Sequence, residues 1–180
     1  MQIRKAGGEE MLKLWGYRGL DDAPNTAKLF FRCIASGTAD FWALEHDGSL
    51  IGELYAFLNI EADPDFADGR TTAYLCAFRV REAYRKQGLG RRLMETVLSD
   101  LRSRGFRRAT IGAERSDARN IGFYRRMGFA ETVKVCFTDP CAMDENNRPE
   151  PDAEGFLLLS KDLLSESPAC PEKLCEIITR

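Results

Sequence analysis

The stretch Arg85-Lys86-Gln87-Gly88-Leu89-Gly90 lies between residues 71–80, which predict a strand, and residues 88–104, which predict a helix. The helix is predicted because apolar residues recur there at four-residue intervals and form one apolar face. Glycine lets a backbone turn closely around a ligand, and the free N–H groups at a helix start attract an anion. The stretch therefore predicts a phosphate-binding turn.

Two common glycine-rich motifs do not fit this turn. A dinucleotide-binding fold uses GxGxxG, and here the third glycine is missing. The spacing GxxxxGK[ST] of a nucleoside triphosphatase loop is missing as well. Positive side chains surround the turn, which suits a ligand with a pyrophosphate and a further phosphate. These side chains are Arg85, Lys86, Arg91 and Arg92.

The remaining pattern predicts further strands and helices. Asp47-Gly48 is typical of a tight antiparallel hairpin turn, and Asn25 or Thr26 can cap the helix that Gly37 ends. Residues 61–70 and 139–154 are polar and acidic, so we expect a loop in the first and an insertion in the second. The predicted strands are residues 2–5, 41–45, 50–58, 71–80, 108–113, 129–137 and 156–160, and the other predicted helices are residues 9–15, 88–104 and 117–127.

Length and composition indicate one globular domain. The chain has 180 residues, of which 44% are hydrophobic, enough for a well-filled core. We expect this domain over residues 1–163, followed by a tail over residues 164–180 whose structure the pattern does not predict. No stretch approaches the roughly 18 apolar residues of a membrane span, and no apolar segment follows the polar N-terminus. The sequence therefore predicts a cytoplasmic protein.

Cysteine and histidine content argues against a metal site. The six cysteines form no CxxC pair, and His46 is the only histidine. We therefore expect reduced thiols and no bound metal.

Charge is unevenly distributed along the chain. Residues 79–126 carry fourteen Lys or Arg against five Asp or Glu, a net charge of +9, which leaves −11 for the rest. Such segregation indicates that the central region meets an anion. A nucleic-acid-binding module is the less favoured explanation, because an apolar helical face interrupts the basic side chains and exposed aromatic residues for stacking are lacking.

Two motifs in this basic region point to the same family. Arg-x-x-Gly-x-Gly after a strand resembles the acetyl-CoA-binding motif of the GCN5-related N-acetyltransferase (GNAT) family. Residues 120–129, which end in Tyr124-x-x-x-Gly128-Phe129, resemble that family's helix-and-strand signature. The resemblance covers roughly residues 71–135, with one helix and one strand between the motifs.

The resemblance implies an α/β (α+β) fold in a single domain. Its mixed central sheet would have about six or seven strands, flanked by about four helices and splayed open where acyl-CoA binds. The pantetheine arm would lie in that gap, and the N–H of Val80 or a neighbour would stabilise the oxyanion. By resemblance, acetyl-CoA would contact Phe78, Arg79, Val80, Arg85, Lys86, Gln87, Gly88, Leu89, Gly90, Arg91, Asn120 and Tyr124.

The implied reaction is direct attack of a neutral amine on the thioester. Tyr124 is the candidate acid for the leaving thiolate, because a phenol stays protonated at neutral pH. Tyr74 stands where some members of the family have a glutamate base, so we consider Glu53, Glu61 and Asp63 as alternatives. Asp117 stands where the family often has asparagine. Asn120 is the residue that could replace the missing asparagine side chain.

The sequence says least about the acceptor, the molecule that would receive the acetyl group. The acidic loop at residues 61–68 and the acidic insertion could attract a cation, such as a polyamine, an aminoglycoside-like amine or a lysine or N-terminal amine. An alcohol or aromatic amine is a further alternative. An inactive CoA-binding sensor also remains open, and a homodimer is plausible by resemblance only. The side chains that could line an aromatic acceptor pocket are Phe30, Phe31, Trp42 and Phe57.

Overall fold

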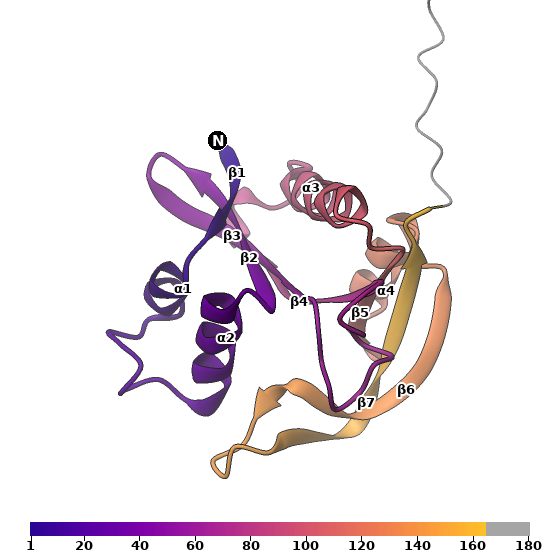
Figure 1. Ribbon diagram of the computed structural model, residues 1–180. Helices are drawn as coiled ribbons and strands as arrows, with labels where there is room; N and C mark the ends of the chain where they lie inside the picture. Colours follow the sequence, from indigo (N-terminus) through magenta and orange to yellow (C-terminus); the bar gives the residue numbers. More distant parts are fainter. Residues whose placement is uncertain (165–180) are drawn as a thin grey trace, which may run out of the picture.

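A mixed sheet of seven strands, in the order β1-β2-β3-β4-β5-β7-β6, runs through the described part of the molecule (Figure 1). The computed structural model describes residues 1–164, so the predicted tail lies outside the described residues except for Leu164. Neighbouring strands are antiparallel except β4 and β5, which confirms the mixed sheet. The strands are β1 (Gln2–Ala6), β2 (Ala39–His46), β3 (Ser49–Phe57), β4 (Thr72–Val80), β5 (Arg108–Glu114), β6 (Glu131–Met143) and β7 (Pro149–Asp162).

Within residues 1–164, four helices cover the two faces of this sheet, as predicted. The core on one face holds apolar side chains of α1 and α2, and the core on the other holds those of α3 and α4. Alternating strand residues divide between the two cores: Leu54 packs on the α3 side and Tyr55 on the α1 side. The helices are α1 (Gly8–Trp15), α2 (Asn25–Ser36), α3 (Leu89–Ser103) and α4 (Ala118–Arg126), and a short 3₁₀ turn, η1, covers Glu82–Tyr84.

The sheet opens between its two parallel strands. β4 and β5 pair only from Thr72↔Arg108 to Leu75↔Ile111, and no pairing continues toward Val80. The later halves of the two strands therefore diverge, which confirms the splayed sheet.

A β-bulge in β4 lies beside this opening. Tyr55 of β3 pairs with Cys76 and Glu53 pairs with Arg79, so Ala77 and Phe78 stand opposite Leu54 alone. Ala77 has a positive φ of 48°, which a non-glycine residue rarely adopts. A bulge leaves its extra residue unpaired, so a backbone group is free at the edge of the opening.

The expected insertion at residues 139–154 is instead a continuation of two strands. β6 extends to Met143 and β7 begins at Pro149, and the two remain paired through Thr138↔Pro151 and Asp139↔Glu150. We call residues 138–154 the arm. Figure 1 shows it curving below the sheet toward α2.

Side chains at the start of α2 hold the tip of the arm. The residue at the N-cap position is Pro24, so the predicted capping role of Asn25 or Thr26 is wrong. The Asn25 amide instead donates to the backbone oxygen of Asp144 at 2.8 Å, and the Thr26 hydroxyl accepts from the N–H of Met143 at 2.9 Å. Both side chains are therefore used for tertiary contact.

Two observations concern membranes and cysteines. Within residues 1–164, no helix is long and apolar enough to cross a membrane. The four cysteines of the described region, Cys33, Cys76, Cys136 and Cys141, are free thiols, as predicted.

Candidate active site

The start of α3 presents backbone N–H groups without a capping side chain. Gly88 occupies the N-cap position with φ 76°, and Lys86 two residues earlier also has a positive φ of 62°. The first bond of the helix runs from the N–H of Arg92 to the oxygen of Gly88. The N–H groups of the first turn therefore point out of the helix with its positive dipole end behind them, a geometry suited to phosphate.

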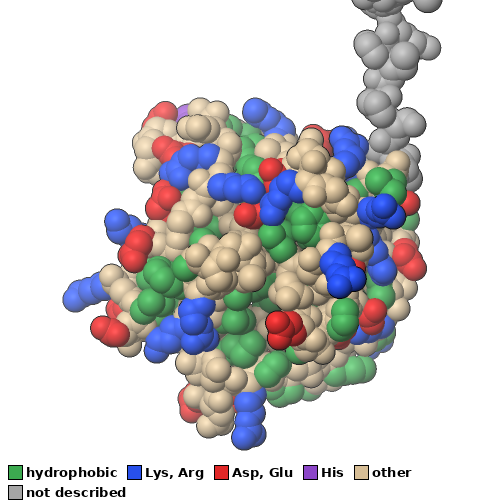
Figure 2. Space-filling view, viewed as in Figure 1, with side chains coloured by type: hydrophobic (Ala, Val, Ile, Leu, Met, Phe, Trp, Pro, Cys, Tyr) green, Lys and Arg blue, Asp and Glu red, His purple; other side chains and the backbone are tan. Residues whose placement is uncertain are grey.

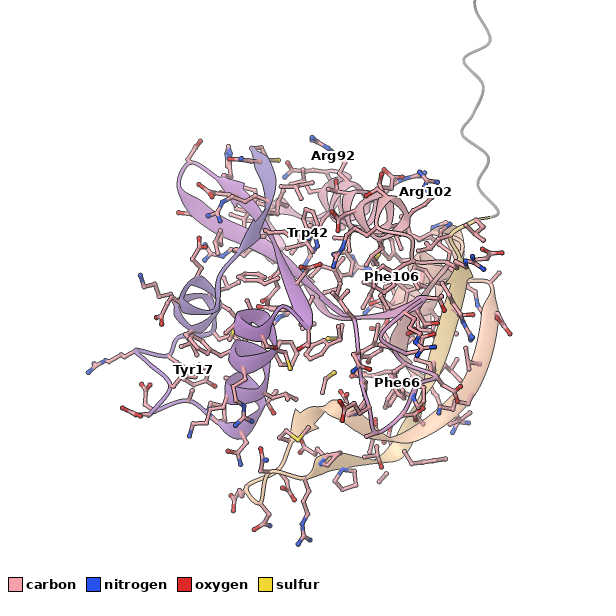
Figure 3. The ribbon with its side chains drawn as sticks, viewed as in Figure 1. Tyr17, Trp42, Phe66, Arg92, Arg102 and Phe106 are labelled. Carbon is pink, nitrogen blue, oxygen red and sulfur yellow. The ribbon has the colours of Figure 1, made fainter. Side chains whose placement is uncertain are left out.

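Basic side chains surround this helix start. Arg85 is fixed by a 2.8 Å hydrogen bond from its Nε to the oxygen of Val80, while Lys86 and Arg92 are exposed. Arg91 forms an exposed ion pair with Glu95. Figure 2 shows basic side chains over the part of the surface where α3 lies, and Figure 3 shows Arg92 and Arg102 projecting from that helix.

The helix start packs closely against the bulge. A Cβ atom at Gly90 would lie 3.0 Å from the Phe78 ring, so a larger residue at this position would force the ring to shift. Phe78 also stacks on Phe123 of α4, with ring centroids 5.7 Å apart. The phosphate-binding turn and the opening of the sheet are thus adjacent.

A cavity of about 220 Å³ occupies the opening. The backbone beside it fits the predicted role of Val80, because Arg81 donates to Ile51 of β3 and hydrogen-bonded positions alternate along an antiparallel ladder. The N–H of Val80 therefore points away from β3, toward the opening. The residues that line the cavity are Tyr74, Cys76, Ala77, Phe78, Ile111, Gly112, Ala113, Glu114, Tyr124, Asp139, Asp152 and Phe156.

Tyr124 lies at the inner wall of this cavity. Its ring is buried against Phe123 and Phe129, and its hydroxyl forms no hydrogen bond with another residue in the described range. Burial, and next the negative charge of Asp117, raise the pKa of Tyr124 to about 12. The hydroxyl is therefore protonated at neutral pH and free to donate.

Three carboxylates line the same cavity: Glu114 of β5 and two residues of the arm, Asp139 and Asp152. Asp139 is half-buried, and burial raises its pKa above the usual value although the N–H of Cys141 donates to it at 2.8 Å. Asp152 accepts hydrogen bonds from the N–H groups of Glu154 and Gly155. The sequence analysis expected the acidic insertion to attract a cation but did not single out these three residues. The pairing of β6 with β7 is what brings Asp139 and Asp152 of the arm to the opening.

Glu53, a predicted catalytic residue, is buried outside this cavity. One carboxylate oxygen accepts from Trp15 Nε1 and the Tyr55 hydroxyl, both at 2.8 Å, and the other lies 2.5 Å from Arg79 Nε. Glu53, Arg79 and Val80 line a separate cleft of about 580 Å³ on the α1 side. Both oxygens of Glu53 are therefore engaged, and Arg79 faces α1 as well, with its guanidinium 5.6 Å from the Trp15 ring.

The other predicted bases also lie away from the cavity. Glu61 is exposed in the loop after β3 and lines neither this cavity nor the α1-side cleft. Asp63 and Asp65 bind Lys134 of β6 at 2.7 and 2.9 Å. These ion pairs connect the loop to β6, and the positive charge of Lys134 partly neutralises the acidic side chains of the loop.

Asp117 and Asn120 form one capping unit at the start of α4. Asp117 accepts from the backbone N–H of Asn120 at 2.9 Å and from its side-chain amide at 2.7 Å. The Asn120 amide, predicted to contact acetyl-CoA, is thus engaged with Asp117.

The four aromatic residues considered for an aromatic acceptor do not form one pocket. Phe30 and Phe57 pack in the core beneath α1 and α2, with Phe31 beside them, whereas Trp42 belongs to the core beneath α3. They are core residues on opposite faces of the sheet. Within the described residues no group of three or more His, Cys, Asp or Glu side chains could hold a metal ion.

Comparisons with known proteins agree with this architecture. The sequence model of the acetyltransferase (GNAT) family matches residues 9–129. A sequence search of curated proteins found no match.

Three solved structures illustrate the likeness in fold. An aminoglycoside 6′-acetyltransferase type Ii is 17% identical, with 93% of this chain and 100% of that chain covered and a TM-score of 0.61. A ribosomal-protein-alanine N-acetyltransferase from Brucella melitensis is 18% identical (90% and 99% covered, TM-score 0.60). A GNAT family acetyltransferase from Elizabethkingia anophelis with acetyl-CoA bound is 16% identical (89% and 97% covered, TM-score 0.57).

Proposed function

The chain belongs to the GNAT family of acetyltransferases, and from this premise we propose that it transfers an acetyl group from acetyl-CoA directly to an amine. The observation that carries the proposal is the position of the β4–β5 opening. It connects the uncapped start of α3 with the cavity that holds the Tyr124 hydroxyl. One groove can therefore bind phosphates at one end and present a proton donor at the other.

The residues present fit acetyl-CoA. The turn from Gln87 to Gly90 offers unpaired N–H groups for a pyrophosphate, with Arg85 and Lys86 at its rim. The bulge at Ala77–Phe78 and the N–H of Val80 offer backbone donors along the opening. A similar structure was solved with acetyl-CoA bound, which supports the same assignment here. Bound acetyl-CoA would supply a thioester that is reactive toward amines.

In this proposal Tyr124 stabilises the leaving group by hydrogen bonding. A hydroxyl with a pKa of about 12 is a weaker acid than a thiol with a pKa near 8.5, so full proton transfer to the thiolate is uphill. Its hydroxyl instead donates a hydrogen bond to the developing thiolate, which takes its proton from water. The carbonyl oxygen of the thioester accepts hydrogen bonds from the free backbone groups at the bulge or Val80.

The two alternatives from the sequence are not favoured by family membership. An inactive CoA-binding sensor would not need a free hydroxyl in the opening, and a nucleic-acid-binding module would not need the opening at all. We also propose that the protein is cytoplasmic and that it forms a homodimer. Light scattering on the purified chain would test the dimer.

Release of free thiol from acetyl-CoA in the presence of amines tests the proposed function. The panel contains polyamines, aminoglycosides, amino acids and a lysine peptide. We expect one acceptor class to release thiol and acetyl-CoA to raise the melting temperature. A melting temperature that acetyl-CoA does not change, together with no thiol release, would refute the proposal.

A further inference from the structure

The arm contributes a distinctive charge to the cavity. The lining contains the carboxylates of Glu114, Asp139 and Asp152, whereas no lysine or arginine of the described residues lines it. The basic side chains of the acetyl-CoA site lie instead around the start of α3. The two ends of the groove therefore carry opposite charge. The end where phosphates would bind is positive, and the end where the acceptor would bind is negative.

Asp139 is the carboxylate placed best to accept a proton. Its Oδ1 is held by the N–H of Cys141, which fixes the side chain at the cavity. The other titratable groups that interact with it are Tyr74 of β4, Cys136 and Cys141 of β6, and Glu150 and Asp152 of β7, and Cys76 of β4 lines the same cavity. Within the described residues, no positively charged side chain forms an ion pair with Asp139, in contrast to Asp63, which binds Lys134.

Resting on the proposed function, we propose that the arm forms the acceptor site, that its ligand is a small amine carrying a second positive charge, and that Asp139 is the catalytic base. Tyr74 of β4 lines the same cavity but offers no carboxylate. Asp139 reaches this cavity from a different strand. Asp152 and Glu114 attract the second positive charge of the acceptor.

The proposed reaction needs only these groups and water. The amine nitrogen forms a bond to the carbonyl carbon of the thioester, and its proton passes to the Asp139 carboxylate. The carbon–sulfur bond breaks, and the sulfur leaves as a thiolate that receives a hydrogen bond from Tyr124. Asp139 returns its proton to water, and the thiolate takes one from water.

The first test is Asp139→Asn, because an amide of the same shape still accepts the bond from Cys141 N–H but cannot take a proton at neutral pH. We expect kcat to fall about 10²-fold or more, with the thermal shift by acetyl-CoA retained. We also expect the acidic limb of the rate–pH profile to disappear, since activity that needs ionised Asp139 rises through its pKa. Asp21→Asn, at an exposed aspartate before α2 that does not line the cavity, is the matched control and should keep full activity.

The second test compares three primary amines of one chain length: 1,5-diaminopentane, pentylamine and 5-aminopentanoate. We expect kcat/KM to fall in that order, and Asp152→Asn to bring the three values closer together. Equal use of the three amines, a preference for the anion, or unchanged kcat in Asp139→Asn would overturn the inference while thiol release still upheld the acetyltransferase. No release with any of the three, from a protein that acetyl-CoA stabilises, would overturn the acceptor class but not the acetyl-CoA site.

Discussion

At the scale of single residues, Tyr124 is defined by a buried ring and a free hydroxyl. Replacement by phenylalanine keeps the ring contacts with Phe123 and Phe129 and removes only the donor. We expect Tyr124→Phe to lower kcat about 10²-fold, with the melting temperature and its shift by acetyl-CoA little changed. Steady-state thiol release measures this. Tyr17→Phe, at a tyrosine that does not line the β4–β5 cavity, serves as the control, and equal kcat values in the two variants would contradict the role.

The negative charge of Asp68 stabilises the folded chain. Burial opposes its ionisation, but the N–H groups of Arg70, Thr71 and Thr72 and the Thr71 hydroxyl together lower the pKa of Asp68 well below its usual value. A lowered folded-state pKa adds stability above the unfolded value of about 3.9, and this stability is lost as the pH falls toward the folded value.

We therefore expect Asp68→Ala to lower the free energy of unfolding by about 2 kcal/mol at pH 7. The difference from the wild type should narrow as the pH is lowered from 5 to 3. Urea denaturation at each pH measures it. Asp21→Ala, at an exposed aspartate, is the comparison, and a difference that stays constant with pH would count against the explanation.

At the scale of elements, α3 has a glycine with positive φ at each end. Gly88 precedes the helix with φ 76° and Gly105 follows it with φ 92°, and a side chain at either position would meet no atom within 4 Å. Alanine at either site should therefore cost about 1 kcal/mol through backbone strain alone. Only Gly88 belongs to the phosphate-binding turn.

We expect Gly88→Ala to weaken acetyl-CoA binding several-fold and Gly105→Ala to leave it unchanged, although both lower stability by a similar amount. Binding is measured by calorimetry with acetyl-CoA, and stability by urea denaturation. If both variants bound acetyl-CoA like the wild type, the start of α3 would not be its phosphate site.

Most elements could be predicted because each has a local signal. The repeat of apolar residues in α3 predicts a helix, and Asp47-Gly48 predicts a tight turn. Both predictions depend only on residues that are neighbours in the sequence. The arm has no such signal, since its residues are polar and pair mainly with each other. Burial of Asp139 depends on β6 bending toward α2, a contact between residues more than one hundred positions apart. The phosphate-binding turn was therefore recognisable in the sequence. The sequence also indicated that the acidic insertion could attract a cation, but not which of its carboxylates reach the cavity.

At the scale of the whole molecule, the proposed acetyl-CoA site and the proposed acceptor site are formed by different parts of the chain. The central segment from β4 to α4 forms the opening, the phosphate-binding turn and the Tyr124 wall. The arm brings negative charge to the opening through Asp139 and Asp152, and the start of α2 holds the tip of the arm (Figure 1). Acceptor binding should therefore respond to changes that leave acetyl-CoA binding intact.

Thr26 tests this division because its hydroxyl both donates to the oxygen of Met143 and accepts from its N–H. Thr26→Ala removes both bonds and should loosen the arm. Each bond contributes about 1 kcal/mol and the two together correspond to a factor of about 30, so we expect the KM for the amine to rise by up to about thirtyfold. The KM for acetyl-CoA should not change, because no part of its site contacts Thr26. Thr26→Ser keeps the hydroxyl and should restore the wild-type KM. A parallel rise in both KM values would mean that the arm supports the whole fold and not the acceptor site alone.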